Sequence, residues 1–299
     1  MRIVTILLFT FVGLIAWQHF RYLRIRRYIT QDQQPMVYAS ETFHAVTFLE
    51  VPADANLYQK IGSLKTALEF SDEAKVVYAG KAALVPLESS QLLPASWNAV
   101  ILVSYPSQQI YETISKDTKT QSALASFSRH YTHGMKRPAL ANLALPQILL
   151  GLRGLDILKG NWRVDQFEPM PTPEGSEQEA ALLRSRLEKL LELKDVNDQA
   201  VLVFNLVLHG DRQQQEANRS YGGKMLARMA ALAHGPMHLG SGVTVEGKAR
   251  FEEIVIVYYP GVDYFTQMVR SQFFQTIVGD KQLGDTMAVP TVPILNQLT

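Results

Sequence analysis

Two parts of the chain repeat one succession of strand-like and helix-like segments, and this repeat constrains the fold more than any other feature. Trp97–Pro106 matches Phe251–Pro260 without a gap, and both stretches end in Tyr-Pro. Both are nearly continuous apolar runs, as expected of central strands that are covered by other parts of the protein.

The segments around this match follow the same order in both copies. Each copy is predicted as strand, helix, strand, strand, helix, strand, which is the split β-α-β or ferredoxin-like arrangement. The predicted first strands are His44–Val51 and Gln199–Leu206, the first helices Leu57–Phe70 and Asp211–His234, the second strands Val76–Val85 and Pro236–Val245, the second helices Gln108–Ser128 and Val262–Thr276, and the closing strands Leu143–Pro146 and Met287–Pro290.

With the two Tyr-Pro strand ends and the matched glycines Gly80 and Gly240, both copies resemble the dimeric α+β-barrel superfamily. Within it they resemble a bacterial family of small domains of unknown function. The resemblance implies an α+β fold in which two tandem ferredoxin-like domains, at residues 40–150 and 198–299, pair their sheets into a barrel within one chain. Some proteins of this superfamily hold haem through a histidine in the barrel cleft, which makes His238 or His133 the first positions to test.

The N-terminal segment is predicted to be a transmembrane anchor. Ile3–Trp17 carries no charge, and Met1–Phe20 would form a helix of about 30 Å, enough to cross a bilayer core. Four arginines follow within Arg21–Arg27, so the positive-inside rule places the C-terminal body in the cytoplasm. We therefore expect a single-pass protein of the inner (cytoplasmic) membrane, with residues 3–20 in the lipid bilayer and residues 1–28 as anchor and basic juxtamembrane segment. A cleaved signal peptide is the alternative, although no A-x-A site follows the apolar run.

The charges are unevenly distributed along the chain. The formal net charge is +1, from 29 basic and 28 acidic residues, but five arginines and no acidic residue precede Asp32. The remaining body holds 24 basic and 28 acidic residues, which argues against nucleic acid as a partner. The chain has no cysteine, which excludes disulfides, thiolate metal sites and a cysteine nucleophile.

Residues 151–197 are predicted to be a linker that contains an amphipathic helix. Three prolines within Pro169–Pro173 indicate an irregular segment, and Ser176 and Glu179 then fit a capping box. The helix is expected to end near Lys194. It is interpreted as a spacer helix that packs on a neighbouring domain, or as a surface for a partner or for self-association.

Most candidate cleft residues lie near the ends of the matched strands, whereas Tyr221 lies within a predicted helical stretch and His238 follows a bend at Gly235-Pro236. Aromatic and polar side chains at these places could meet a ligand, although an ordinary packing role competes with each. No G-x-S-x-G, phosphate-loop or H-E-x-x-H motif occurs, and Gly240-Ser241-Gly242 is interpreted as a turn between strands. The His130-x-x-His133 pair lacks a nearby acidic third ligand, and a solvated loop is the simpler interpretation. The ligand-cleft candidates are Trp97, Asn98, Tyr105, Tyr221, His238, Tyr258 and Tyr259.

These observations predict a membrane-anchored, non-catalytic binding or scaffold protein, whose paired sheets form a cleft for a small apolar ligand or a protein partner. No cofactor and no metal are predicted. The alternative is a cofactor-free or haem-dependent monooxygenase of the dimeric α+β-barrel type, acting in the same cleft.

Overall fold

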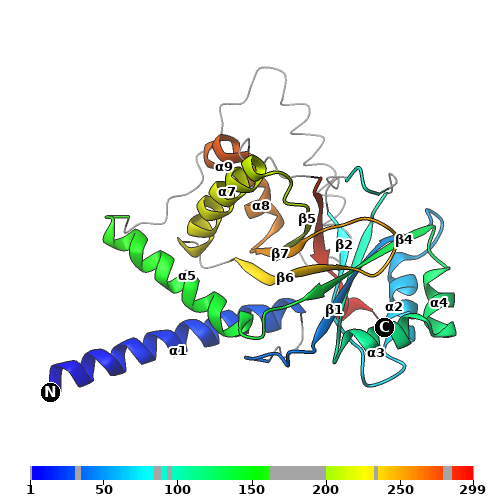
Figure 1. Ribbon diagram of the computed structural model, residues 1–299, viewed down its shortest axis with the longest axis horizontal. Coiled ribbons are helices and arrows are strands. Elements are labelled where there is room, and N and C mark those ends of the chain that lie inside the picture. The colour runs from blue at the N-terminus through cyan, green and yellow to red at the C-terminus, as the bar shows by residue number, and fades with distance from the viewer. Residues whose placement is uncertain are drawn as a thin grey trace.

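The computed structural model describes residues 2–30, 35–83, 89–92, 96–161, 200–231, 235–278 and 285–298 (Figure 1). Within them the chain forms eight α-helices and eight β-strands, so the protein is α+β. The predicted connector helix that ends near Lys194 lies outside these residues, as does His234.

The first half-barrel contains the first repeat of strands and helices. Its elements are β1 (Phe43–Glu50), α2 (Leu57–Leu68), β2 (Lys75–Ala82), β3 (Ala99–Tyr105), α3 (Gln108–Ser115), α4 (Thr118–Leu124) and β4 (Arg129–Lys136). Asn56 begins α2, because its side chain accepts a hydrogen bond from the backbone N–H of Gln59 at 3.0 Å. The predicted second helix is broken in two because Asp117 caps a new helix, accepting from Lys119 N at 2.8 Å.

The second half-barrel follows the same order. Its elements are β5 (Val201–Val207), α7 (Arg212–Ala231), β6 (Pro236–Thr244), β7 (Glu253–Tyr259), α8 (Val262–Val269), α9 (Gln272–Ile277) and β8 (Met287–Pro293), and the 3-10 helix η2 (Leu295–Gln297) follows. The prolines after Tyr105 and Tyr259 explain why both third strands end at the matched position. Proline has no N–H for the strand ladder, so the chain leaves the sheet there and enters the next helix.

The eight strands close into a single antiparallel barrel in the order β1-β3-β2-β8-β5-β7-β6-β4. Each half contributes four neighbouring strands, and the halves join where β2 pairs with β8 and where β4 pairs with β6. At the second junction a Cβ atom on Gly240 would lie 2.5 Å from the carbonyl oxygen of Lys136. The predicted Gly240-Ser241-Gly242 turn is therefore wrong: these residues lie within β6, where glycine lets two strands approach closely.

Strand pairing in the two halves has the same register. Thr47 lies opposite Ile101 in β1 and β3, just as Asn205 lies opposite Val255 in β5 and β7. Two residues further along, and so on the same face, Leu49 lies opposite Ala99, and Val207 lies opposite Glu253. Residues of the two halves can therefore be compared position by position.

The barrel interior is filled with buried apolar side chains from both halves. Phe48 and Tyr78 of the first half meet Phe204 of the second, with ring centroids 6.4 and 5.3 Å apart. The outer face of the first half is covered by α2, α3 and α4, and that of the second half by α7, α8 and α9 (Figure 1). The predicted cleft between the paired sheets is thus occupied by the protein's own core.

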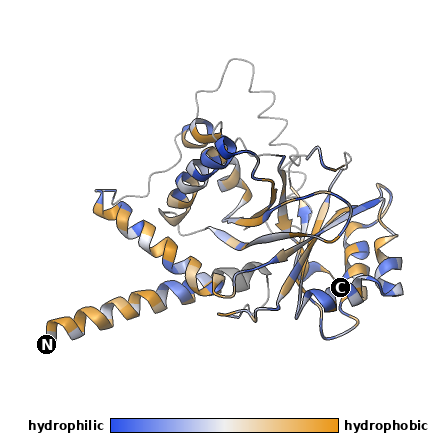
Figure 2. Ribbon diagram, in the orientation of Figure 1, coloured by the Kyte–Doolittle hydropathy of each residue, from blue (hydrophilic) through white to orange (hydrophobic). Residues whose placement is uncertain are grey.

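Two apolar helices leave the barrel on the same side (Figures 1 and 2). They are α1 (Arg2–Thr30) and α5 (Ala141–Leu158). Ile3–Arg24 within α1, and the whole of α5, are long and apolar enough to cross a membrane by length and composition. Near its C-terminal end α1 is attached to the body, where Tyr22 packs with Leu145 and Leu149 of α5 and its hydroxyl donates to the carbonyl oxygen of Pro236.

The predicted closing strand Leu143–Pro146 is wrong, because these residues form part of α5. The fourth strand of the first half is β4, which pairs with β1 along its whole length. Its polar residues are satisfied there: the Thr132 hydroxyl, for example, lies 3.1 Å from that of Thr47. The corresponding prediction in the second half, Met287–Pro290, is confirmed within β8.

Candidate functional site

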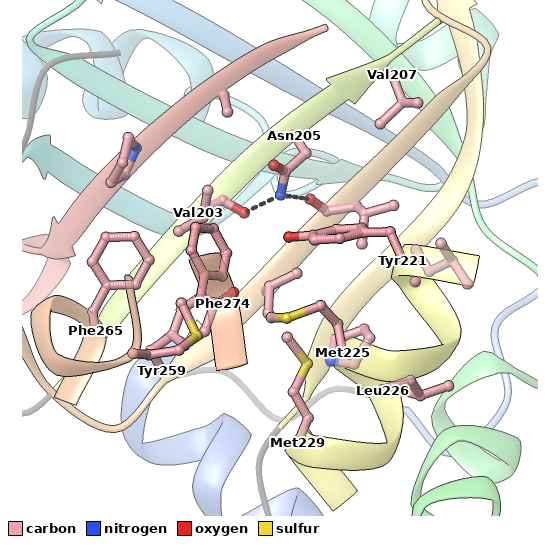
Figure 3. A pocket seen from close by; sticks show the side chains of 18 of the residues that line it. Val203, Asn205, Val207, Tyr221, Met225, Leu226, Met229, Tyr259, Phe265 and Phe274 are labelled. Carbon is pink, nitrogen blue, oxygen red and sulfur yellow. Dashed lines mark hydrogen bonds between the residues drawn. The ribbon is translucent and has the colours of Figure 1, made fainter. Parts of the chain in front are cut away.

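A cavity of about 460 Å³ lies between the outer face of the second half's sheet and the helices that cover it (Figure 3). We call it the α7 cavity. Strands β5 and β7 form its floor, and α7, α8 and α9 form much of its wall. The volume falls within the range of about 300–1,000 Å³ that is usual for small-molecule sites.

The α7 cavity exists because α7 fills little of the space above its sheet. Met225 and Met229 are its main buried side chains over the sheet, and Gly222 lies in the cavity wall. A Cβ atom placed on Gly222 or Gly223 would meet nothing within 4 Å. Among the described residues no other backbone therefore approaches these glycines, and Gly222 leaves open space in the cavity wall.

Apolar side chains make up most of the cavity wall, and Asn205 supplies a polar group on its floor. The Asn205 side-chain nitrogen donates to the carbonyl oxygens of Val203 and Val255, at 3.2 and 3.0 Å (Figure 3). Both amide hydrogens are used in these bonds, so the amide oxygen is the atom left to accept a hydrogen bond from a ligand.

Glu253 is the carboxyl group of the cavity wall. Its side chain is 31% exposed, and its Oε2 lies 3.6 Å from Nε2 of His209. Burial raises the pKa of the Glu253 carboxyl above its ordinary value, and the charge of His209 opposes that shift. A carboxyl with a raised pKa at the edge of an apolar cavity is suited to take up and release protons.

Two tyrosines reach the cavity from opposite sides, Tyr221 from α7 and Tyr259 from β7 (Figure 3). Burial raises the pKa of Tyr221 to about 12. It also raises the pKa of Tyr259, and the neighbouring Tyr221 adds to that shift. Both hydroxyls therefore stay protonated at neutral pH and act through hydrogen bonds rather than as bases.

The structure brings only these two tyrosines of the predicted cleft residues into the α7 cavity. Trp97 is buried in the barrel interior, and Tyr258 packs partly buried against the same core. Tyr105 lies under the helices of the first half. Asn98 bonds the backbone N–H of Val51 through its side-chain oxygen, at 2.9 Å, which ties two chain segments together.

Sequence reasoning missed Asn205 and Glu253. Asn205 is a polar residue inside an otherwise apolar strand, and this was the available signal. The matched strands differ at Asn98 and Glu252, but the informative difference is one residue later, where Ala99 of the first copy corresponds to Glu253.

The candidate histidines His130, His133 and His238 do not line the α7 cavity. His130 and His133 belong to β4 rather than to a loop, and their odd spacing places them on opposite faces of the strand. His133 donates from Nε2 to the carbonyl oxygen of Phe251 at 3.1 Å, and its Nδ1 accepts from the Tyr131 hydroxyl at 2.8 Å. Nδ1 of His238 accepts from Arg137 at 2.7 Å. No group of three histidine or acidic side chains suited to a metal occurs among the residues that the structure describes.

Comparison with known proteins finds similarity only in the fold. No protein-family model and no curated sequence matches the chain. A candidate monooxygenase from Fusobacterium nucleatum subsp. nucleatum is 8% identical, with a TM-score of 0.41 over 85% of this chain and 93% of that chain. An anthrone oxidase-like protein is 8% identical, with a TM-score of 0.43 over 86% and 92% of the two chains. A chlorite dismutase from Candidatus Nitrospira defluvii is 10% identical, with a TM-score of 0.41 over 87% and 94%.

The prediction of a non-catalytic binding or scaffold protein with a cleft between its paired sheets is wrong. The three solved structures described above are named as a monooxygenase, an anthrone oxidase-like protein and a chlorite dismutase, and none of them is named as a binding or scaffold protein. The barrel interior is also packed with buried side chains, and a cavity large enough for a small molecule lies outside it, under α7.

The α7 cavity does not fit haem. Its described wall contains no histidine to bind the iron, and no lysine or arginine to pair with the two propionates. A tyrosine ligand would have to be ionised, which the raised pKa values of Tyr221 and Tyr259 oppose. The candidates from the haem resemblance, His133 and His238, are buried in the barrel wall and already hydrogen-bonded through the ring nitrogens named above.

Proposed function

We propose that the protein is a cofactor-independent monooxygenase that acts on a small, flat, apolar substrate in the α7 cavity. The observation that carries this proposal is the placement of Glu253, a carboxyl group with a raised pKa, in the wall of an otherwise largely apolar cavity. Such a cavity excludes water from the reacting carbon, while the carboxyl supplies a base.

The chemistry requires a substrate that can itself reduce oxygen, such as a ring ketone with an acidic CH₂ group. Glu253 removes one proton from that carbon and leaves an enolate. The enolate passes electrons to O₂ and forms a carbon–oxygen bond, and the proton returned by Glu253 completes a hydroperoxide. Loss of the second carbon-bound hydrogen as the O–O bond breaks yields a ketone and one water molecule, so that CH₂ and O₂ become C=O and H₂O.

The other polar groups would orient the substrate. The Tyr221 and Tyr259 hydroxyls, which stay protonated, are suited to donate to the enolate oxygen as its charge develops. The amide oxygen of Asn205 would accept from a phenolic hydroxyl of the substrate. The methionines of α7 adapt their shape to flat aromatic rings.

The test uses anthrone, a flat ring ketone with an acidic CH₂ group, and measures oxygen uptake together with anthraquinone formation by the purified full chain. We expect Glu253→Gln to lower the rate by about 100-fold or more, as is usual for loss of a general base. Glu252→Gln is the matched control, because this neighbouring carboxyl is exposed and bonds the backbone N–H of His209 at 2.9 Å. Equal rates for Glu253→Gln and the control would refute the assignment.

We also propose that α1 crosses the cytoplasmic membrane through residues 3–20, with the barrel in the cytoplasm. The length and apolar surface of α1 and the arginines at its C-terminal end support this placement. A reporter fused to the C-terminus that is active only in the cytoplasm is expected to be active. Activity of a reporter that works only in the periplasm would refute the orientation.

A further inference from the structure

One side of α5 is an apolar stripe that the described body leaves uncovered. Ala144, Ile148, Gly151, Leu155 and Leu158 follow one another at spacings of three and four residues, and all five are exposed. Leu155 is 57% and Leu158 84% exposed. The opposite side of the same helix, with Leu145 and Leu149, is buried against α1 and α7.

The charges of α5 do not interrupt this stripe. Arg153 and Asp156 bond each other, with Nη1 and Oδ2 3.0 Å apart, and their side chains are 18% and 31% exposed. Because the two charges pair on the helix itself, the net charge of this surface stays close to zero. An exposed, neutral, apolar helix face of this length marks an interaction surface in a soluble protein.

The position of α5 beside α1 indicates which partner covers it. The first turns of α5 pack on Tyr22 of α1, one turn from Trp17, whose ring lies 5.4 Å from the Arg21 guanidinium carbon. Tryptophan and arginine together are typical of the boundary between a membrane and water. From that point both helices extend away from the barrel on the same side, and hydrophobic residues predominate in both (Figure 2).

We propose that the apolar stripe of α5 lies in the interfacial region of the bilayer that α1 enters. An interfacial helix places its apolar face about 5–10 Å into the boundary between headgroups and acyl chains, with its other face on the protein. The occupant of the stripe is therefore lipid, and the arginines near the end of α1 favour an anionic surface. The proposal goes beyond the proposed function and does not depend on the chemistry of the α7 cavity.

The arrangement would hold α7, and with it the α7 cavity, beside the membrane surface. Leu226 of α7 packs in the cluster with α5 and also lines the cavity, so α7 alone separates α5 from the cavity. A Cβ atom on Gly235, at the end of the segment after α7, would lie 3.3 Å from Leu149 of α5.

The test uses the absence of cysteine in the chain, which allows one labelled cysteine at a time. Full chains with Leu155→Cys or Leu158→Cys carry an environment-sensitive fluorophore and are placed in vesicles of phosphatidylethanolamine and phosphatidylglycerol. Half of the vesicles contain a lipid with a quencher at a shallow acyl position. Phe9→Cys reports the bilayer at α1, and Asp72→Cys, exposed between α2 and β2, reports water.

We expect the quencher to lower the emission at positions 155 and 158 by about twofold or more, as at position 9 and unlike position 72. Emission at 155 and 158 that behaves like position 72 would overturn the proposal, whether or not position 9 is quenched. Disulfide-linked dimers of unlabelled Leu155→Cys, together with no lipid quenching of the labelled protein, would also overturn it, because a second copy of the chain would then cover the stripe.

Discussion

The two half-barrels have the same strands in the same register, but their helices fill the outer faces differently. In the first half Ile61 and Leu64 of α2 are fully buried on the sheet, together with Ile101 of β3. In the second half α7 is longer, yet a cavity of about 460 Å³ separates much of it from the sheet. The strands thus determine that a barrel forms. The covering helices determine whether the outer face of each half is fully packed or leaves a cavity.

The two halves also differ in the strand residues that lie on the outer face of the sheet. The outward positions Thr47 and Ala99 of the first half correspond to Asn205 and Glu253 of the second. Polar groups on a buried face cost free energy unless something compensates them. At these positions the first half has only the Thr47 hydroxyl, which bonds Thr132, whereas the second half has an amide and a carboxyl that line a cavity.

The largest difference is expected for truncation of the covering helices. Leu64→Ala should lower the free energy of unfolding by about 2–5 kcal/mol, because it opens a new cavity in a filled layer. Met225→Ala should cost less than about 2 kcal/mol, because this side chain already borders open space. Urea unfolding of the full chain in detergent, followed by fluorescence, measures both. A Met225→Ala cost as large as that of Leu64→Ala would contradict the comparison.

A second pair of variants adds volume instead of removing it. Ile101→Phe should destabilise the protein by about 1–3 kcal/mol, because its surroundings are already full. Val255→Phe at the matched position should cost less than about 1 kcal/mol, because the ring can enter the α7 cavity. Thermal unfolding of both variants tests this, and binding of anthrone should weaken only in Val255→Phe. Equal destabilisation would show that the α7 cavity does not exist in solution.

Gly223→Ala is expected to stabilise the protein by about 0.5–1 kcal/mol, because alanine loses less backbone entropy in a helix and meets no neighbour there. Its counterpart is Gly240→Ala, in which the new methyl group would lie against the backbone of Lys136 and should destabilise the barrel. Shifts in the unfolding midpoint measure both. A loss of stability in Gly223→Ala would mean that some part of the chain packs on this side of α7.

The smallest effect is a dependence of stability on pH that comes from Glu253. Because the folded state raises the pKa of this carboxyl, its stabilising contribution is complete below the ordinary Glu pKa of about 4.3 and is lost as the pH rises through the folded-state pKa. The side chain is one-third exposed, so solvent screens the effect. Between acid and neutral pH the wild type should lose slightly more stability than Glu253→Gln. Parallel curves for the two proteins would show that Glu253 is fully solvated.

Much of the fold was predictable from the chain itself. The gapless match of Trp97–Pro106 with Phe251–Pro260 predicted equivalent central strands, and the strand pairing confirms that equivalence. The fourth strand of the first half was not predictable by the same reasoning, because Arg129–Lys136 is rich in polar residues. Those residues become compatible with a strand only when β1 and β6 supply their partners.

The candidate site was less predictable. Tyr259 was identified by its type at a strand end and Tyr221 by its type within a helical stretch, and both line the α7 cavity. Nothing in the sequence pairs Asn205 with Glu253, because their position on one face follows from the register of β5 and β7. The position of the cavity was missed, because an apolar strand pattern does not show on which of its two faces the packing is incomplete.

By itself the sequence determined the order of the strands and helices except for the fourth strand of the first half, together with the equivalence of the two copies and the apolar character of the N-terminal helix. These properties follow from local periodicity, from the prolines that end strands and from composition. Only the tertiary structure decided that the barrel interior is filled, that the open space lies under α7 and that α5 is an exposed apolar helix. Those properties depend on how the side chains of segments that are distant in the chain fill a shared volume. The local sequence pattern contains no information on that packing.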